Sequence, residues 1–143
     1  MGAMQRRKGG SGERELAHLL ADELGADVRR RCRQHPGDSD VLGVDGWACE
    51  VKRHARATRS DVRAWWGQTV EQAAASGETP MLAYRLDRSP WRCVWPLAVA
   101  LGVPVVGGWR DFDMTCETSI AGWAAVVREH ATAREREAVE VAQ

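Results

Sequence analysis

Three residues capable of metal and phosphate chemistry, Asp40, Glu50 and Lys52, flank a strong turn signal. Asp45-Gly46 separates two apolar runs, and this dipeptide favours a two-residue β-hairpin because both residues tolerate positive φ. Side chains alternate faces along a strand, so Glu50 and Lys52 are expected to share one face. The antiparallel return of the hairpin then brings Asp40, at the start of the first strand, close to Glu50.

Two neighbouring carboxylates repel each other unless a cation lies between them. Mg²⁺ prefers oxygen ligands and keeps several waters, so Asp40, Glu50 and the carbonyl of Val51 are the expected metal ligands, with Mn²⁺ as a substitute. The metal offsets phosphate charge and acidifies a water, while Lys52 positions that water or stabilises the transition state. The motif Glu-x-Lys alone is common, and its bland interpretation is a surface ion pair across one strand face. The combination with an acidic strand start and a hairpin favours metal-dependent phosphodiester hydrolysis.

Basic residues gather in short groups, although the chain carries 20 basic and 20 acidic residues. A neutral total can hide a basic face, and such a face attracts a polyanion. For any single group, an ordinary solvated surface is an equally good interpretation. The residues expected to hold DNA phosphates, without reading sequence, are Arg6, Arg7, Lys8, Arg14, Arg29, Arg30, Arg31, Arg33, Arg53, His54, Arg56 and Arg59.

The supporting elements follow from apolar periodicity and from helix-ending residues. We expect a flexible basic arm over residues 1–10, in which residues 1–3 resemble an expression remnant, and one nuclease domain over residues 11–143. Ser11 and Ser60 are the expected N-caps of two helices that end at Gly25 and Gly77. The other expected elements are strands at 26–33, 40–44, 47–53, 80–86 and 91–95, a short helix at 97–101, one more strand within 103–115, and a helix from 119 to about 137. This order predicts an α/β fold with a central mixed sheet flanked by helices, in which Cys49 and Val51 face the core.

Several classes of protein are excluded or disfavoured. No apolar run approaches the ~20 residues that span a membrane, and the basic N-terminus does not resemble a secretory signal. The cysteines form no Cys-x-x-Cys pair, which disfavours a zinc site or disulfide framework and suits a cytoplasmic location. Gly107-Gly108 lacks a following lysine and hydroxyl residue, so we expect no nucleotide cofactor.

The pattern resembles the PD-(D/E)XK nuclease superfamily and, more narrowly, the archaeal-type Holliday junction resolvases and their bacteriophage relatives. The resemblance covers roughly residues 6–95 and is carried by residues 7–16, 47–53, 66–68 and 80–91. It implies a restriction-endonuclease-like fold. It also implies that Glu13, with Glu15 as the alternative, assists metal binding, and that Gln68 lies near the site. Ser39 stands where the family usually has proline, so Asp38 competes with Asp40 as the ligand; Asp40 is preferred because the strand continues directly from it.

The same resemblance implies a homodimer that resolves four-way DNA junctions in recombination and repair, leaving 5′-phosphate and 3′-hydroxyl ends. Branched double-stranded DNA is therefore the expected partner. Two alternatives stay open at this point: another PD-(D/E)XK nuclease of repair or restriction type, and a non-catalytic DNA-binding module.

Overall fold

A computed structural model describes residues 2–25, 29–30, 40–103 and 108–143 of the chain. Within these residues, six strands form one sheet in the order in which they follow along the chain. Only β3 and β4 run parallel, and the other neighbouring pairs are antiparallel, so the sheet is mixed. The strands are β1 (Arg29–Arg30), β2 (Val41–Leu42), β3 (Trp47–His54), β4 (Thr79–Leu86), β5 (Arg92–Pro96) and β6 (Thr115–Thr118). The helices are α1 (Gly2–Leu24), α2 (Arg59–Ser76), α3 (Leu97–Leu101), the 3₁₀ turn η1 (Phe112–Met114) and α4 (Ile120–Ala142).

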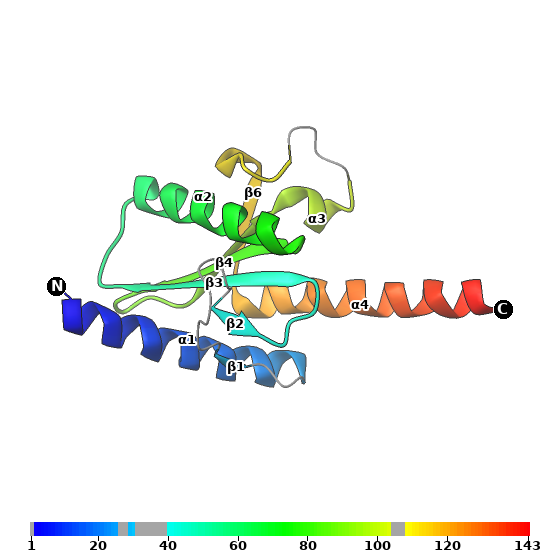
Figure 1. The fold of residues 1–143 in the computed structure, drawn as a ribbon, viewed down its shortest axis with the longest axis horizontal. Coiled ribbons are helices and arrows are strands. Elements are labelled where there is room, and N and C mark those ends of the chain that lie inside the picture. Colours follow the sequence, from blue (N-terminus) through cyan, green and yellow to red (C-terminus); the bar gives the residue numbers. More distant parts are fainter. Residues whose placement is uncertain (1, 26–28, 31–39, 104–107) are drawn as a thin grey trace.

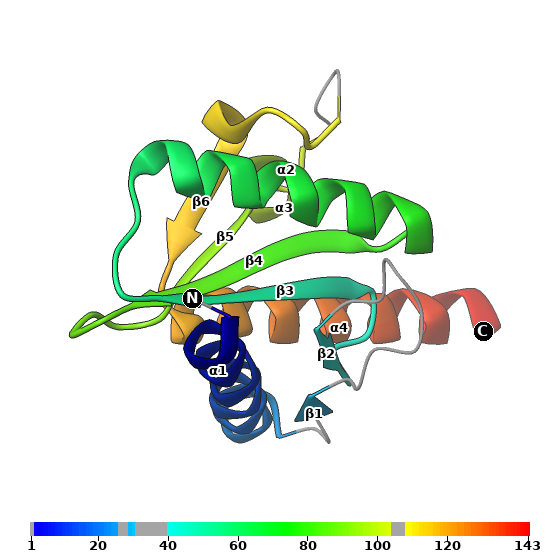
Figure 2. The ribbon, with the colours of Figure 1, turned by 60° about the vertical axis from the view of Figure 1, so that its left-hand side comes forward.

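Helices cover both faces of the sheet, as the expected fold class requires (Figures 1 and 2). On one face, α1 and α4 pack over a core that includes Leu16, Cys49, Val51 and Trp123. On the other, α2 packs over a second core that includes Trp66. The inward orientation predicted for Cys49 and Val51 is confirmed, because both belong to the first core. The α/β prediction of a mixed sheet flanked by helices is confirmed as well.

Helix α2 begins at Arg59, and its N-cap is Thr58 rather than the predicted Ser60. The Thr58 hydroxyl accepts a hydrogen bond from the Asp61 amide at 3.2 Å, and the Asp61 carboxylate accepts one from the Thr58 amide at 2.8 Å. These hydrogen bonds lower the pKa of Asp61. A reciprocal capping box needs an acceptor three residues beyond the cap, and Ser60 has Arg63 there. The predicted end at Gly77 is confirmed by its left-handed φ of 70°.

Helix α1 begins at Gly2, so the predicted start at Ser11 is wrong and residues 2–10 are helical. Glycines lower helix propensity, and for this reason the sequence suggested that no helix forms before Ser11. Gly12 has a packing role instead, since a Cβ at that position would lie 2.9 Å from the Cβ of Arg53 on β3. The missing side chain therefore allows α1 to cross β3 closely. The predicted end of the helix at Gly25 is confirmed by its φ of 63°.

Replacing Gly12 by alanine is expected to destabilise the protein by about 1–3 kcal/mol, because the new methyl group overlaps a backbone-proximal atom. Gly67 in the middle of α2 is the matched control, since a Cβ there meets nothing within 4 Å. Gly67→Ala should raise stability by about 0.5–1 kcal/mol through helix propensity. Urea unfolding of both variants measures the contrast, and equal shifts in the same direction would contradict the close crossing.

The C-terminal third differs from the prediction in two ways. The strand expected within 103–115 lies later, at Thr115–Thr118, and follows the turn η1; residues 104–107 are outside the described part. The last helix continues to Ala142 rather than ending near residue 137. Its start is as predicted, because the Ser119 hydroxyl accepts the Gly122 amide at 3.1 Å. Among the described helices, none combines the length and apolarity that a membrane span requires.

Candidate active site

The predicted antiparallel pairing of β2 with β3 is present, with Val41 opposite Cys49, but residues 43–46 separate the strands where a two-residue turn was expected. The Trp47 amide donates to the Val44 carbonyl at 3.2 Å and closes the turn. Gly46 has a φ of 83°, whereas Asp45 is not among the described residues with positive φ. Gly43, with a φ of 104°, and Gly46 therefore supply the positive-φ conformations of this connection, in place of Asp45 and Gly46 as the sequence suggested. Of the strand expected over 26–33, only Arg29–Arg30 is described as strand, and residues 31–39 lie outside the described part.

Asp40 is fixed against β3 by two hydrogen bonds. Its amide donates to the Cys49 carbonyl at 3.0 Å, and its carboxylate accepts the Val51 amide at 2.9 Å. The amide and carbonyl of one strand residue point to the same edge, so the Val51 carbonyl also points to the edge on which Asp40 lies. A carboxylate and a carbonyl oxygen are thus presented side by side at the edge of β3.

Glu50 and Lys52 project toward α2, on the opposite face from Cys49 and Val51. The β3–β4 register sets Glu50 beside Leu82 and Lys52 beside Tyr84, and both neighbours belong to the core under α2. Glu50 is only 3% exposed, and Asp40 only 2%. Burying two carboxylates is costly unless hydrogen bonds or a cation compensate. Asp40 accepts the Val51 amide, and a bound cation would offset the remaining negative charge of the two acids.

Cys49 is the neighbour of Glu50 on β3, and its thiol is buried in the core under α1 and α4. Burial raises the pKa of the Cys49 thiol well above its usual range. Negative charge nearby raises this pKa further, from Cys93, Glu78, Glu50 and Asp40. The thiol therefore stays protonated near neutral pH and is a poor metal ligand. Two carboxylates and a carbonyl form a hard oxygen set, which fits Mg²⁺ or Mn²⁺.

The glutamine that reaches this site is Gln72, which the sequence reasoning missed. The Gln72 amide is oriented with its nitrogen toward Glu50, because the carboxylate oxygens can only accept. In this orientation the nitrogen donates to the Glu50 carboxylate. The predicted Gln68 is one helical turn earlier, and its side chain is exposed. Gln68 and Gln72 are four residues apart and so lie on the same side of α2. The sequence therefore indicated the correct helix and side, but one turn too early.

Gln72→Ala should lower nuclease activity about tenfold or more, because Glu50 loses the neighbour that orients its carboxylate. Gln68→Ala on the same helix serves as the control and should retain wild-type activity. Cleavage rates measured across a metal titration test both variants. Equal losses for the two glutamines would contradict the assignment to Gln72.

The two glutamates of α1 have different surroundings. Glu15 accepts a hydrogen bond from the Trp91 indole at 2.9 Å and forms an ion pair with Arg85, so it anchors α1 to the sheet. The Oε1 atom of Glu15 is thus used in a contact between α1 and the sheet. Glu13 is half-buried, and within the described residues no three His, Cys, Asp or Glu side chains gather closely enough to hold a metal. Glu13 is therefore not brought together with Asp40 and Glu50 in this arrangement.

Several residues expected to hold phosphates have contacts within the fold. Arg53 forms an ion pair with Asp87 at 2.8 Å, and His54 stacks on Trp65 with 4.7 Å between ring centroids. Arg59 lies 3.4 Å from Glu117 and also covers the ring of Phe112. The first two side chains are thus part of the packing around β3, and Arg59 connects α2 to β6.

The structure describes the remaining basic residues to different extents. Arg14 and Arg56 are exposed and form no ion pair within the described part of the chain. The backbones of Arg6, Arg7 and Lys8 lie in α1, and those of Arg29 and Arg30 lie in β1. Arg31 and Arg33 lie outside the described residues.

Comparison with known families identifies the chain at this point. A family profile described as "Phage putative PDDEXK endonuclease" matches residues 4–111, a segment that contains the whole Asp40–Lys52 hairpin. The chain belongs to this PDDEXK endonuclease family. Membership indicates a nuclease, of a superfamily that uses divalent metals, and agrees with the oxygen-donor site.

Two further comparisons give less. A search of curated proteins found no match. Among solved structures, the chain is similar to Hjc, a Holliday junction resolvase from the archaeal hyperthermophile Archaeoglobus fulgidus, with 26% identity and a TM-score of 0.44. That similarity covers 60% of this chain and 70% of the archaeal chain.

Proposed function

We propose that this PDDEXK endonuclease is a Mg²⁺-dependent enzyme that cuts four-way DNA junctions as a homodimer in the cytoplasm. The observation that carries the metal-dependent chemistry is the hydrogen bond from the Val51 amide to the Asp40 carboxylate. It aligns the Asp40 carboxylate with the Val51 carbonyl at one strand edge, next to the buried Glu50. The preference for junctions rests on the sequence resemblance of residues 6–95 to junction resolvases.

The roles of the residues follow from their positions. Asp40, Glu50 and the Val51 carbonyl hold the metal, and Glu13 approaches this site when DNA is bound. A metal held by these groups would supply positive charge against the scissile phosphate and would lower the pKa of a water. Lys52, on the same face as Glu50, orients the attacking water and donates to a phosphate oxygen as negative charge develops. Gln72 keeps the Glu50 carboxylate in position through its amide.

DNA is held by basic side chains around this site. The exposed Arg14 and Arg56, together with the basic residues of α1 and β1, supply phosphate contacts that do not depend on sequence. Arg59 exchanges its contact with Glu117 for a phosphate when DNA binds. Hydrolysis leaves 5′-phosphate and 3′-hydroxyl ends, as in the nucleases that the sequence resembles.

Cleavage of a labelled four-way junction, compared with a linear duplex of the same sequence, tests the proposal. We expect cutting of the junction with Mg²⁺ or Mn²⁺, loss of cutting with EDTA, and weaker cutting of the duplex. Equal cutting of both substrates would instead indicate a repair or restriction-type nuclease. Junction binding without any cutting in either metal would leave only a DNA-binding module and overturn the enzymatic proposal.

A further inference from the structure

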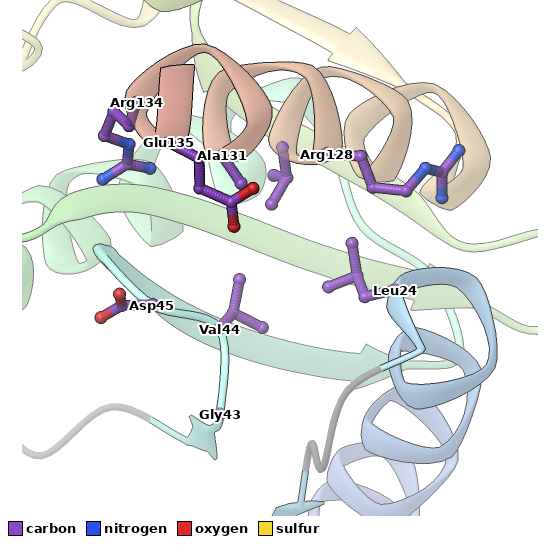
Figure 3. A pocket seen from close by; sticks show the side chains of 9 residues that line it. Leu24, Gly43, Val44, Asp45, Arg128, Ala131, Arg134 and Glu135 are labelled. Carbon is purple, nitrogen blue, oxygen red and sulfur yellow. The ribbon is translucent and has the colours of Figure 1, made fainter. Parts of the chain in front are cut away.

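Two hollows on the described surface differ in the side chains that line them. The groove between α4 and the β2–β3 connection is mainly apolar, with Leu24, Val44 and Ala131 among its walls (Figure 3). A second cavity, of about 430 Å³, lies between the first turns of α2, η1 and β6, and its lining is mainly polar. Arg59 and Arg63 line this second cavity. Arginine is the side chain best suited to phosphate, so the cavity beside α2 has the chemistry of an anion site.

The two arginines of this cavity share one aromatic ring. Arg59 and Arg63 are one turn apart on α2, and their guanidinium carbons lie 5.0 and 5.1 Å from the centroid of the Phe112 ring. Like charges four residues apart on a helix repel each other, whereas an aromatic ring attracts a cation. The two side chains are 69% and 60% exposed. Two positive groups are thus held together where solvent, or a ligand, can reach them.

The carboxylate of Glu117 on β6 lies among these cations and receives contacts from three other elements. It accepts a hydrogen bond from the Tyr84 hydroxyl on β4 at 2.6 Å. It also lies 3.4 Å from Arg59 on α2 and 3.4 Å from Arg92 on β5. Burial, followed by the hydrogen bond to Glu117, raises the pKa of Tyr84 to about 12, so the phenol remains a donor near neutral pH. One anionic group therefore gathers two arginines and a phenol.

The arginine contacts in this cavity are long. Arg59 and Arg92 each lie 3.4 Å from Glu117, and Arg63 lies 3.2 Å from Asp113. Charge-assisted N–H···O hydrogen bonds are about 2.7–2.9 Å long, so the guanidinium donors are only loosely engaged. Exposed ion pairs of this kind contribute little to stability. A phosphate can accept two parallel hydrogen bonds from one guanidinium, so exchange of the carboxylate for a phosphate improves the contacts of the arginines.

We propose that this cavity binds a phosphate group of the DNA backbone and that Glu117 occupies the place of this phosphate in the free protein. The donors are Arg59, Arg63 and Arg92. Arg63 and Gln72 are nine residues, or about two and a half turns, apart, so they lie on opposite sides of α2. The phosphate bound here is therefore a second point of the DNA backbone, separate from the scissile phosphate near Glu50. The inference rests on the proposed function for its DNA substrate.

Arg63→Ala tests the cavity, with Arg110→Ala as the matched control. Both side chains are exposed and form an ion pair, but Arg110 pairs with Glu71 at 3.6 Å and does not line the cavity. Fluorescence anisotropy of a labelled four-way junction in EDTA measures binding without cutting. Arg63→Ala should weaken binding about three- to tenfold and lower the slope of log K against log salt concentration by about 0.9, because one phosphate contact is lost. Equal effects of the two substitutions would overturn the inference.

Glu117→Gln tests the role of the carboxylate, with Glu71→Gln as the control for the change in net charge. Glutamine still offers an oxygen to the Tyr84 hydroxyl, so the fold is retained. Removing the charge of Glu117 frees the arginines, and junction binding should tighten about threefold or more beyond the effect of Glu71→Gln. A purely structural role would lower the thermal stability and leave the affinity equal to that of Glu71→Gln. That result would contradict the proposal.

Inorganic phosphate separates a DNA contact from a site for a free anion. At matched ionic strength, inorganic phosphate should displace the junction no better than chloride does. Specific displacement that is lost in Arg63→Ala would assign the cavity to a free anion and overturn the DNA assignment. Cutting is measured separately with Mg²⁺. A wild type that binds the junction without cutting it would count against the proposed function alone, whereas normal cutting with equal binding by all four variants would count against this inference alone.

Discussion

Asp40→Asn is expected to reduce junction cleavage roughly 10³-fold, equivalent to about 4 kcal/mol of transition-state stabilisation. In the proposed site, the substitution removes one of the two negative charges that would hold the metal. The amide oxygen of asparagine still accepts the Val51 amide, so the hairpin keeps its geometry. DNA binding should persist, since Asp40 contributes no positive charge to the phosphate contacts. Single-turnover cleavage and electrophoretic mobility shifts measure the two properties separately.

Asp45→Asn provides the control for this experiment. Asp45 lies in the same hairpin, five residues away, but its side chain is exposed at the turn. We expect nearly wild-type cleavage from this variant and unchanged thermal stability from both. Wild-type cleavage by Asp40→Asn would show that Asp38 or another acid is the ligand, and it would overturn the site as described.

Lys52→Met is expected to lower kcat about 10²- to 10³-fold with little change in metal affinity. Methionine preserves the length of the side chain and its contacts beside Tyr84 but removes the ammonium group. An interaction made chiefly in the transition state lowers kcat and kcat/KM together, whereas a phosphate contact made equally in the bound ground state raises KM. The kinetic pattern therefore distinguishes a catalytic lysine from a lysine that only binds DNA.

Lys8 is the only other lysine of the chain and offers the natural comparison. Lys8→Met should raise KM and reduce the salt dependence of DNA binding, with kcat preserved, because a single phosphate contact is lost. A Lys52→Met enzyme that behaves in this same way would remove Lys52 from the catalytic group.

The hairpin could be predicted because its determinants are local. Alternation along Cys49-Glu50-Val51-Lys52 fixes which side chains share a face, whatever surrounds the strand. Gly46 likewise fixes the turn. The helix ends at Gly25 and Gly77 were predicted for the same reason, since a left-handed residue ends a helix through its own backbone conformation.

Other predictions failed because distant contacts decided them. Propensity alone indicated a break at Gly12. In the fold this glycine lies within α1, where its missing side chain leaves room for β3. Gln68 and Gln72 are equivalent by spacing on α2, and only the docking of α2 over β3 selects Gln72 for Glu50. Arg53 was expected to hold DNA phosphate and Glu15 was the alternative metal-site glutamate, and the fold pairs them with Asp87 and Arg85.

The sequence by itself determined which groups form the proposed site: two acids, a carbonyl and a lysine, brought together by a strand reversal between residues close in the chain. Tertiary structure decided how far those acids are buried and which glutamine reaches Glu50. These properties depend on how helices cross a sheet, and that crossing is set by the summed packing of side chains distant in the chain.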